Sequence, residues 1–375
     1  MTGGTAETKQ AGKRLFHPLC GADLGTLARA VTQNGVHGRG ALPLLIAAGA
    51  TLGRLPFSAL EYLYAEARGA AAGPGVPPVF ILGHWRSGTT HLYNVMSKAP
   101  HWAYVSPFAT ALPWDFLVLV RALGPLLEKA LPEDRFIDNI PVEPDSPQED
   151  EIGLANMTDL SYYHALYFPR RFAEIFDESI FFDGVTPARR TAWQRLLRYY
   201  YGKLSLGQGG QRLLIKNPVY TARVALLREM WPDAKFIHIH RNPYKVYVSM
   251  RNFYERLFAE FALEPYDHVD IDQVVLGTYS KMMTRYAEES ASLPESQLVE
   301  LRFDDFQRAP MTELAKIYER LSLPGFAEGR PRFEAYLASV ADYQKNSYTF
   351  PRDAKERVSR SWAPFIERWS YSPPA

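Results

Sequence analysis

A short apolar strand followed by a glycine-bounded loop constrains this chain more than any other feature. Residues 79–82 read Val-Phe-Ile-Leu, and a run without polar side chains is typical of a strand that is buried on both faces. Residues 83–88 then form a loop that leads into a predicted helix beginning at Thr89. Such a strand–loop–helix unit directs backbone N–H groups and a helix N-terminus towards an anion. The sequence therefore predicts a phosphate-binding loop here.

Strands and helices alternate along the second half of the chain. A further apolar run predicts a strand at 213–215, and strands are also predicted at 236–240 and 298–303. Helices are predicted at 221–230, 243–260 and 311–321. Strands that alternate with helices form parallel sheets with right-handed crossovers. We therefore predict an α/β fold: a P-loop-like three-layer structure with a central parallel sheet flanked by helices, plus helical insertions.

The predicted elements divide the chain into a tail and one domain. Residues 1–20 are polar and are expected to form a flexible tail, whereas residues 21–375 are expected to form a single domain. The core of this domain is expected at 79–99 and 212–325. Between these segments, residues at about 100–210 are rich in aromatic side chains and read as a largely helical insertion.

Charge and cysteine content exclude several classes of protein. The chain has 42 Lys and Arg against 41 Asp and Glu, a net charge of +1, so binding to nucleic acid through bulk charge is not expected. The single cysteine, Cys20, excludes an intramolecular disulfide and a cysteine-built metal site, and it fits a reducing compartment. The basic residues near the N-terminus are not followed by the apolar segment of a secretory signal. We expect a cytoplasmic protein.

An uncharged apolar stretch lies inside a segment, 25–70, that reads as helical. The stretch covers 40–53, which is shorter than the roughly 20 residues needed to span a bilayer, and Pro43 and Gly49 interrupt it. A buried helix is the favoured interpretation. A surface that docks on lipid, which would make the protein peripheral at a membrane, is the alternative.

The predicted phosphate loop lacks the lysine of nucleoside triphosphatases. Residues 83–90 have the spacing G-x-x-x-x-G-x-T, but Thr89 stands where those enzymes place a lysine for the β- and γ-phosphates. Arg86 is the only cation in the loop. The strand at 236–240 leads into Arg241 rather than into an aspartate that could hold Mg²⁺. An ATPase or a GTPase is therefore disfavoured.

A second anion site is predicted after the strand at 236–240. Arg241 leaves the end of that strand, Asn242-Pro243 makes a turn, and Ser249 follows two helical turns further on. An arginine fork and a hydroxyl group in this arrangement can bind a second phosphate group.

Together the two motifs resemble the sulfotransferase family that uses 3′-phosphoadenosine 5′-phosphosulfate (PAPS). The run Arg86-Ser87-Gly88-Thr89-Thr90 is similar to that family's 5′-phosphosulfate loop, in the arginine form of its bacterial and carbohydrate-type branches. Arg241 and Ser249, eight positions apart, match the pair that holds the 3′-phosphate. Lys216-Asn217-Pro218 resembles a Lys-Ser-Pro segment of the same branches, and Phe303-Asp304-Asp305-Phe306 resembles a late Tyr-Glu-Asp-Leu block.

The resemblance implies a PAPS-dependent sulfotransferase that releases 3′,5′-diphosphoadenosine (PAP) and requires no metal. The implied donor site consists of Arg86, Ser87, Gly88, Thr89, Thr90, Lys216, Arg241 and Ser249. Two positions depart from the cytosolic branch, which has lysine at Arg86 and, at His91, a tryptophan that stacks on adenine. Because a guanidinium cannot give up its proton, Arg86 is expected to stabilise charge on the leaving group and not to act as an acid.

Sulfuryl transfer also needs a base that takes the proton of the acceptor, besides alignment and charge stabilisation. The acidic run at 145–151 supplies two candidates, Glu149 and Glu151. The same run reads as a helix capping box, Ser146-x-x-Glu149, so Glu149 is expected as the cap and Glu151 as the residue freer to act. His84, inside the loop, is the rival base.

The acceptor is expected to bind among aromatic residues of the 100–210 insertion. Apolar rings with polar tips suit a small apolar or lipid-like hydroxyl or amine, although most of these rings are expected to fill the core. They are Trp102, Tyr104, Phe108, Trp114, Phe116, Tyr162, Tyr163, Tyr167 and Phe168. No histidine spacing indicates a metal site, and His238 and His240 are expected to be structural.

Two alternatives come from other classes of protein. A P-loop kinase of a small metabolite would require Mg²⁺ and the lysine that the loop lacks. A non-catalytic, membrane-associated nucleotide-binding protein would not need the intact set of Arg86, Arg241 and Ser249. The expected partners are a small-molecule acceptor and no nucleic acid, with a peripheral membrane contact and a homodimer left open.

Overall fold

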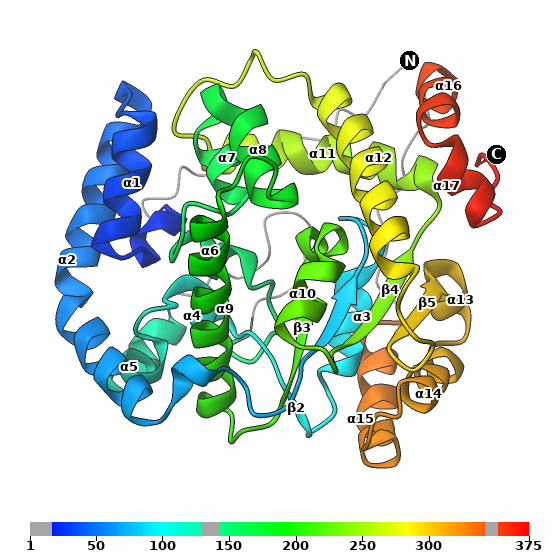
Figure 1. The fold of residues 1–375 in the computed structure, drawn as a ribbon, viewed down its shortest axis with the longest axis horizontal. Coiled ribbons are helices and arrows are strands. Elements are labelled where there is room, and N and C mark those ends of the chain that lie inside the picture. Colours follow the sequence, from blue (N-terminus) through cyan, green and yellow to red (C-terminus); the bar gives the residue numbers. More distant parts are fainter. Residues whose placement is uncertain (1–16, 130–142, 342–351, 375) are drawn as a thin grey trace, which may run out of the picture.

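A parallel sheet forms the centre of the protein. The computed structural model describes residues 17–129, 143–341 and 352–374, and within them five strands pair in the order β2-β3-β1-β4-β5 (Figure 1). All pairs are parallel, and Ile81 lies beside both Lys216 and Ile237. The strands are β1 (Val79–Leu82), β2 (Trp102–Ala103), β3 (Arg212–Lys216), β4 (Lys235–His240) and β5 (Leu298–Arg302).

Within the described residues, six helices accompany the sheet. They are α3 (Thr89–Met96), α10 (Val224–Met230), α11 (Pro243–Phe261), α12 (Ile271–Ser290), α13 (Phe303–Arg308) and α14 (Pro310–Arg320). The sequence predicts four of them, α3, α10, α11 and α14, whereas it does not predict α12 and α13. The helix predicted at 221–230 begins later, because a 3-10 turn, η4 (Pro218–Ala222), precedes it. The strand predicted at 298–303 ends one residue early, since Phe303 already begins α13. The two-residue β2 is too short to show a pattern in the sequence.

An insertion between β2 and β3 is largely helical, as the aromatic-rich segment predicts. Its elements are α4 (Pro107–Ala111), α5 (Phe116–Glu128), α6 (Glu151–Ala155), α7 (Tyr163–Tyr167), η3 (Pro169–Arg171), α8 (Phe172–Phe181) and α9 (Pro187–Gly207). At the C-terminal end, α15 (Phe326–Ser339) contacts α3 and α14, while α16 (Arg352–Ser361) contacts α11 and is followed by α17 (Ala363–Arg368).

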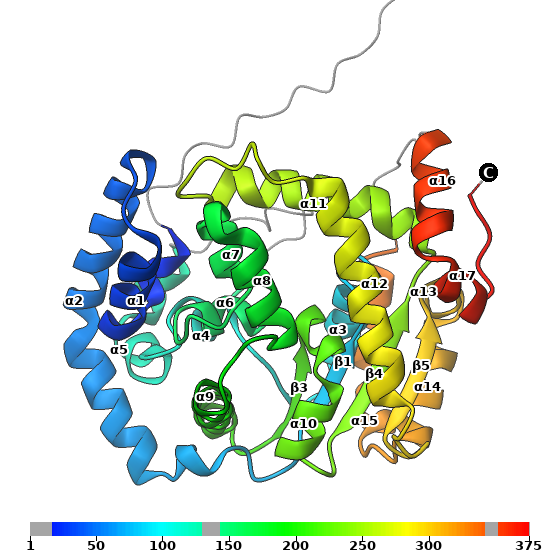
Figure 2. The same cartoon turned by 45° about the horizontal axis from the view of Figure 1, so that its top comes forward.

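Helices cover both faces of the sheet because successive strand residues point to opposite sides. Phe80 and Leu82 of β1 belong to one buried core with residues of α9 and α10, and Figure 2 shows α9 end-on. Val79 and Ile81 belong to another buried core with residues of α3 and α14. All four side chains are fully buried. The predicted three-layer α/β fold is therefore confirmed.

Two N-terminal helices form one edge of the molecule (Figures 1 and 2). They are α1 (Leu24–Asn34) and α2 (Gly38–Ala67), and a short turn, η2 (Ala70–Ala72), follows them. Of the predicted flexible tail, residues 1–16 lie outside the described residues. Pro18–Gly21 forms a 3-10 turn, η1, in which Leu19 is fully buried, so the ordered domain begins before residue 21.

Helix α2 differs from the short buried helix that the sequence favours. It runs for 30 residues and continues through Pro43, although an interior proline removes a backbone hydrogen bond. Leu44 on its inner side is buried, whereas Leu45 and Leu52 are 70% and 56% exposed. The favoured interpretation is therefore wrong for the outer side of the helix. Packing of the inner side supports the helix despite the proline.

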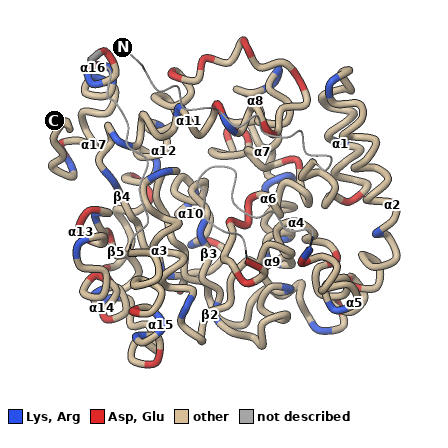
Figure 3. The backbone as a smooth tube through the Cα atoms, turned by 180° about the vertical axis from the view of Figure 1, so that it is seen from behind, with Lys and Arg blue, Asp and Glu red and all other residues tan. Residues whose placement is uncertain are grey.

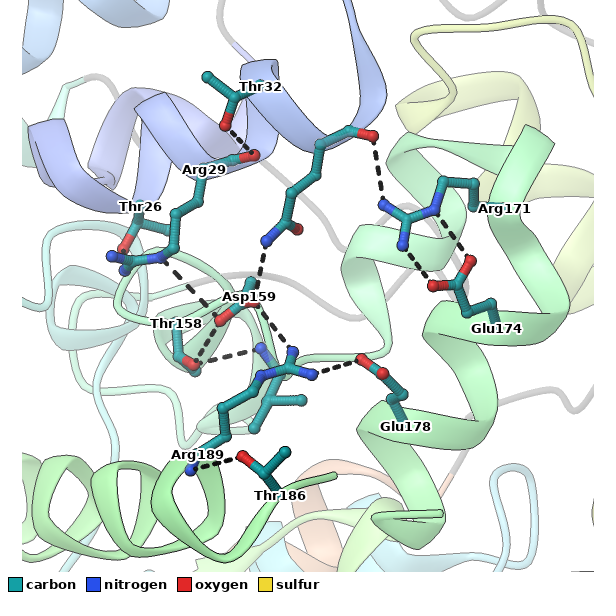
Figure 4. Close-up of polar contacts among 12 residues, drawn as sticks. Thr26, Arg29, Thr32, Thr158, Asp159, Arg171, Glu174, Glu178, Thr186 and Arg189 are labelled. Carbon is teal, nitrogen blue, oxygen red and sulfur yellow. Dashed lines mark hydrogen bonds and ion pairs between the residues drawn. The ribbon is translucent and has the colours of Figure 1, made fainter. Parts of the chain in front are cut away.

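Charged contacts around Asp159 hold α1 against the insertion (Figure 4). Asp159 Oδ2 lies 3.0 Å from Arg189 Nη2 of α9 and accepts a hydrogen bond from Gln33 Nε2 of α1 at 3.4 Å. Arg189 Nη1 also lies 2.9 Å from Glu178 Oε2 of α8. Burial is the largest single influence and raises the pKa of Asp159. The guanidinium of Arg189, the hydrogen bond from Gln33 and the charge of Arg29 nevertheless together leave this pKa below its ordinary value. The carboxylate stays charged and ties the N-terminal helices to the body of the protein.

Candidate active site

The loop after β1 adopts a conformation that requires glycine at two positions. Gly83 and Gly88 have φ of +143° and +102°. A Cβ at Gly83 would collide with the carbonyl oxygen of Ile239, and a Cβ at Gly88 would collide with the ring of Phe303. Arg86 has a φ of 67°, a conformation that costs an L-residue about 1 kcal/mol. Strain of this kind is common at binding sites.

The loop and the start of α3 provide hydrogen-bond donors suited to an anion. Helix α3 begins at Thr89 with Gly88 as its N-cap, and glycine has no side chain that could cap the first amides. The Ser87 hydroxyl is buried and has no hydrogen-bond partner in the described part of the chain. The Gly83 amide donates to Thr221 Oγ1 at 2.8 Å, which fixes the end of β1. These features fit the predicted phosphate loop.

Residues that lie 163 positions apart in the sequence meet beside this loop. Arg86 Nε donates to Ser249 Oγ of α11 at 2.9 Å, and Arg241 Nη1 donates to the backbone carbonyl oxygen of Arg86 at 3.3 Å. The guanidinium carbon of Arg241 lies 4.8 Å from the centroid of the Phe303 ring, a favourable cation–π arrangement. The structure thus brings together three residues of the predicted donor site.

A second group of polar side chains lies at the end of β3, the strand that flanks β1 on the side opposite β4. Lys216, at the end of β3, donates from Nζ to Thr90 Oγ1 at 3.3 Å and forms an ion pair with Glu149. The Lys216 side chain is 1% exposed and that of Glu149 is 15% exposed. Because β3 and β4 flank β1 on opposite sides, this group and the Arg241 group lie on the two sides of the loop.

The two acids that follow Glu149 are buried in a polar network. Asn217 Nδ2 donates to Asp150 Oδ1 at 2.8 Å and to Glu151 Oε2 at 2.7 Å, and Ser161 Oγ donates to Glu151 Oε1 at 2.8 Å. Helix α6 begins only at Glu151, so Glu149 does not cap it. The expectation that Glu149 is the cap and Glu151 the freer acid is therefore wrong. Chain-distant partners decide the exposure of these carboxylates.

Burial raises the pKa of Asp150 to about 7, although the hydroxyls of Tyr201 and Tyr220 donate to its Oδ2 at 2.6 and 2.5 Å. Since an unfolded aspartate titrates near 3.9, the folded protein binds the extra proton between these values, and stability falls as pH rises through this range. The free energy of unfolding of the parent should fall by about 3 kcal/mol between pH 5 and 7.5 because of this group, and Asp150→Asn is expected to abolish that fall. Denaturant unfolding of both proteins at these pH values checks it; identical pH dependences would contradict it.

The rival base, His84, lies on the β4 side of the loop. Its Nδ1 is 3.0 Å from the carbonyl oxygen of Trp85, and its ring centroid is 4.9 Å from that of Tyr279. It lines a small pocket together with His238 and Arg241. Burial lowers the pKa of His84 to about 4, so the imidazole is neutral at pH 7.

His238 and His240 have contacts that fit the structural role expected of them. His238 Nδ1 lies 3.2 Å from Glu300 Oε1, and His240 Nδ1 lies 2.9 Å from the hydroxyl of Tyr371. Burial lowers the pKa of His240 to about 3. Among the described residues, no group of three or more His, Cys, Asp or Glu side chains is arranged to hold a metal ion.

Most of the aromatic residues singled out in the insertion fill the core, as expected. Seven of the nine are buried, and only Tyr104 and Trp114 are partly exposed. Tyr162 packs edge-on against Trp85 of the loop, with ring centroids 5.1 Å apart. Burial raises the pKa of Tyr162 well above its ordinary value, and Tyr163 and Glu149 add to this effect. The loop therefore adjoins an aromatic region near Glu149.

Two contacts of the site have no signal in the sequence. Thr221 supports the loop from a 3-10 turn that follows the Lys216-Asn217-Pro218 motif. Sequence spacing does not indicate that its hydroxyl accepts a hydrogen bond from the Gly83 amide. Phe303 belongs to a motif that the resemblance identifies, but its packing on Arg241 depends on how β5 lies beside β4.

Comparisons with known proteins agree with this geometry. A family described as "Sulfotransferase family" matches residues 77–328, which include both anion-binding motifs. Omega-hydroxy-beta-dihydromenaquinone-9 sulfotransferase Stf3, from Mycobacterium bovis and from Mycobacterium tuberculosis, is 30% identical to this chain over 295 residues, which are 79% of this chain and 75% of the relative.

Two solved structures share the fold. Sulfotransferase STF9 from Mycobacterium avium has a TM-score of 0.67 at 16% identity, with 94% of this chain and 97% of that chain covered. Sulfotransferase STF1 from Mycobacterium tuberculosis has a TM-score of 0.60 at 19% identity, with 90% and 91% covered.

Proposed function

Because this chain belongs to the sulfotransferase family, we propose that it transfers the sulfuryl group of PAPS to a hydroxyl group of an apolar, lipid-like acceptor. The main support is the arrangement of cations around the loop. Arg86 contacts Ser249 and Arg241 on one side, and Lys216 flanks the loop on the other. Two sets of cations around one anion cradle suit a donor that has both a phosphosulfate and a separate phosphate.

Each part of the donor would have a group of this chain to bind it. The amides at the start of α3 and the buried Ser87 hydroxyl would bind the 5′-phosphosulfate, and Arg241 with Ser249 would bind the 3′-phosphate. When bound, PAPS supplies an activated sulfuryl group with a phosphate as its leaving group. Arg86 and Lys216 are cations at the loop, where they would neutralise charge on the leaving oxygen.

Glu149 is the carboxylate best placed to take the proton of the acceptor. It is partly exposed and reaches Lys216 beside the loop, whereas Glu151 is fully buried and satisfied by Ser161 and Asn217. A general base must come within hydrogen-bond distance of the proton that it removes. In the proposed reaction, the acceptor oxygen would form a bond to sulfur while the bond from sulfur to the bridging oxygen of PAPS breaks, so that PAP leaves and the acceptor proton passes to Glu149.

The aromatic region beside the loop would bind the acceptor. The Trp85 indole N–H and the Tyr167 hydroxyl are buried and have no hydrogen-bond partner among the described residues. Apolar rings with a few polar atoms suit an apolar molecule that carries a hydroxyl group. The relative Stf3 is named for an omega-hydroxy-dihydromenaquinone, and a related lipid acceptor would fit this chain.

Calorimetric binding of PAP and of ATP without metal tests the proposed donor. We expect PAP to bind and ATP to bind at least tenfold more weakly. Arg241→Ala is expected to raise the Kd of PAP about 30-fold, because a charge-assisted hydrogen bond contributes about 2 kcal/mol. Arg308→Ala, at a 76% exposed arginine, is the control and should leave the Kd unchanged.

Two results would contradict the proposed donor site. Equal affinity for PAP and ATP would favour a P-loop kinase instead. An unchanged Kd in Arg241→Ala would remove Arg241 from the 3′-phosphate site.

A further inference from the structure

An apolar surface remains exposed along α2. Of the twelve large hydrophobic side chains that are exposed in the described part of the chain, seven belong to this helix. We call them the α2 face: Leu42, Leu45, Leu52, Leu55, Leu60, Tyr62 and Leu63. Their exposure ranges from 41% for Leu55 to 70% for Leu45. Contiguous apolar patches of this kind on soluble proteins mark a surface that binds a partner or a membrane.

The charged residues of α2 do not interrupt this face. Between Arg39 and Glu66 the only charged residues of the helix are Arg54 and Glu61. Arg54 Nη1 is 2.7 Å from Asp115 Oδ2, and Glu61 is fully buried in an ion pair with Lys203 at 2.5 Å. Figure 3 accordingly shows α2 without charge along most of its length. Residues 42–63 thus present an uncharged face about 33 Å long.

We propose that the α2 face docks on the surface of a lipid bilayer, with the helix lying in the plane of the interface. By length and composition α2 could cross a membrane. Its inner side, however, is fastened to α5 and α9 by the pairs of Arg54 with Asp115 and of Glu61 with Lys203. Crossing would expose these charges to hydrocarbon, whereas lying flat buries only the outer leucines.

The shape and the rim of the face favour a bilayer over a second copy of the chain. Exposed residues at 52, 55, 60, 62 and 63 spread around the outer side of α2, wider than the narrow seam by which two helices pair. The helix also lies at the edge of the molecule, where a flat surface can reach it (Figures 1 and 2).

Arginines stand at both ends of the face. Arg39 and Arg68 are exposed, and Arg121 of α5 lies 5.8 Å from the ring centroid of Tyr64. Cations beside an apolar face complement anionic headgroups. Docking would also bring the protein to a lipid-dissolved acceptor, and in this respect the inference rests on the proposed function.

Flotation of the full chain with vesicles of phosphatidylglycerol and phosphatidylethanolamine tests this surface. We expect the protein to float, and L45E/L52E to lower the bound fraction at least tenfold. L24E/V76E adds the same charge at side chains 42% and 38% exposed outside the face, and should float like the parent. An unchanged circular-dichroism melting transition of each variant shows that its fold is intact. Leu63→Glu, near the other end of the face, replaces the double variant if that variant does not fold.

Three outcomes would overturn the proposal: no flotation of the parent, equal flotation of L45E/L52E, or a dimer in sedimentation velocity that L45E/L52E dissociates. The last would assign the face to a second copy. Flotation uses vesicles without acceptor, so absence of PAP binding alongside normal flotation would refute only the proposed function.

Discussion

Replacing Arg86 by alanine is expected to lower kcat for sulfuryl transfer to an apolar alcohol by about 10²- to 10³-fold, with the Kd of PAP changed only a few-fold. The side chain is a permanent cation at the loop and would stabilise charge on the leaving oxygen. Its backbone carbonyl, which accepts the hydrogen bond from Arg241, remains in the alanine variant. Arg241 is therefore expected to keep its position, so the variant should bind PAP nearly normally but carry out the chemical step more slowly.

Arg86→Lys is the matched control, because it keeps a positive charge but loses the Nε–H that reaches Ser249. Its kcat should lie between those of the parent and of Arg86→Ala. Single-turnover transfer of labelled sulfuryl groups and calorimetry with PAP measure the two quantities separately. A normal kcat in Arg86→Ala would remove this residue from the chemistry, and a large rise in Kd would make it a binding residue.

Glu149→Gln should lower kcat by about 10²- to 10⁴-fold, the range that a general base contributes. The glutamine retains the shape of the side chain and can still reach Lys216, but it cannot accept the proton of the acceptor. The low-pH limb of the kcat profile should therefore disappear in the variant. A residue that only positioned Lys216 would leave this limb in place, so the pH profile separates the two roles.

Glu151→Gln provides the comparison within the same acidic run. Glu151 accepts hydrogen bonds from Ser161 and Asn217 in the interior, so its replacement should lower stability and change kcat less than tenfold. PAP affinity should be unaffected in Glu149→Gln. The base would have to be reassigned to Glu151 if its variant lost the pH limb while Glu149→Gln kept it.

The order of the core elements follows from local sequence patterns. Apolar runs predict β1 and β3 nearly to the residue, because strands buried on both faces need an unbroken apolar segment, and β4 is predicted nearly to the residue although it contains two histidines. Gly83 and Gly88 mark the loop, since positive φ and close approach exclude other residues there. The sequence alone marks these strands and glycines, whereas the close approach of Ile239 and Phe303 to the two glycines comes from the fold.

Contacts between distant segments decide what these patterns leave open. Glu149 and Glu151 stand two residues apart with the same side chain, and only the positions of Lys216 and Asn217 make one partly exposed and the other buried. Likewise, the pairing of β1 with both β3 and β4 decides which cations face each other across the loop.

Helix α2 shows the same division on the surface. Its apolar composition is plain in the sequence, yet composition does not say which sides of a helix the rest of the chain covers. The tertiary structure packs Leu44 and Ala47 inside and leaves Leu45 and Leu52 outside. The sequence by itself thus determines four of the five strands described, the phosphate loop and the family resemblance. Tertiary packing alone decides which carboxylate meets the loop and which apolar face stays exposed, because burial depends on the whole fold.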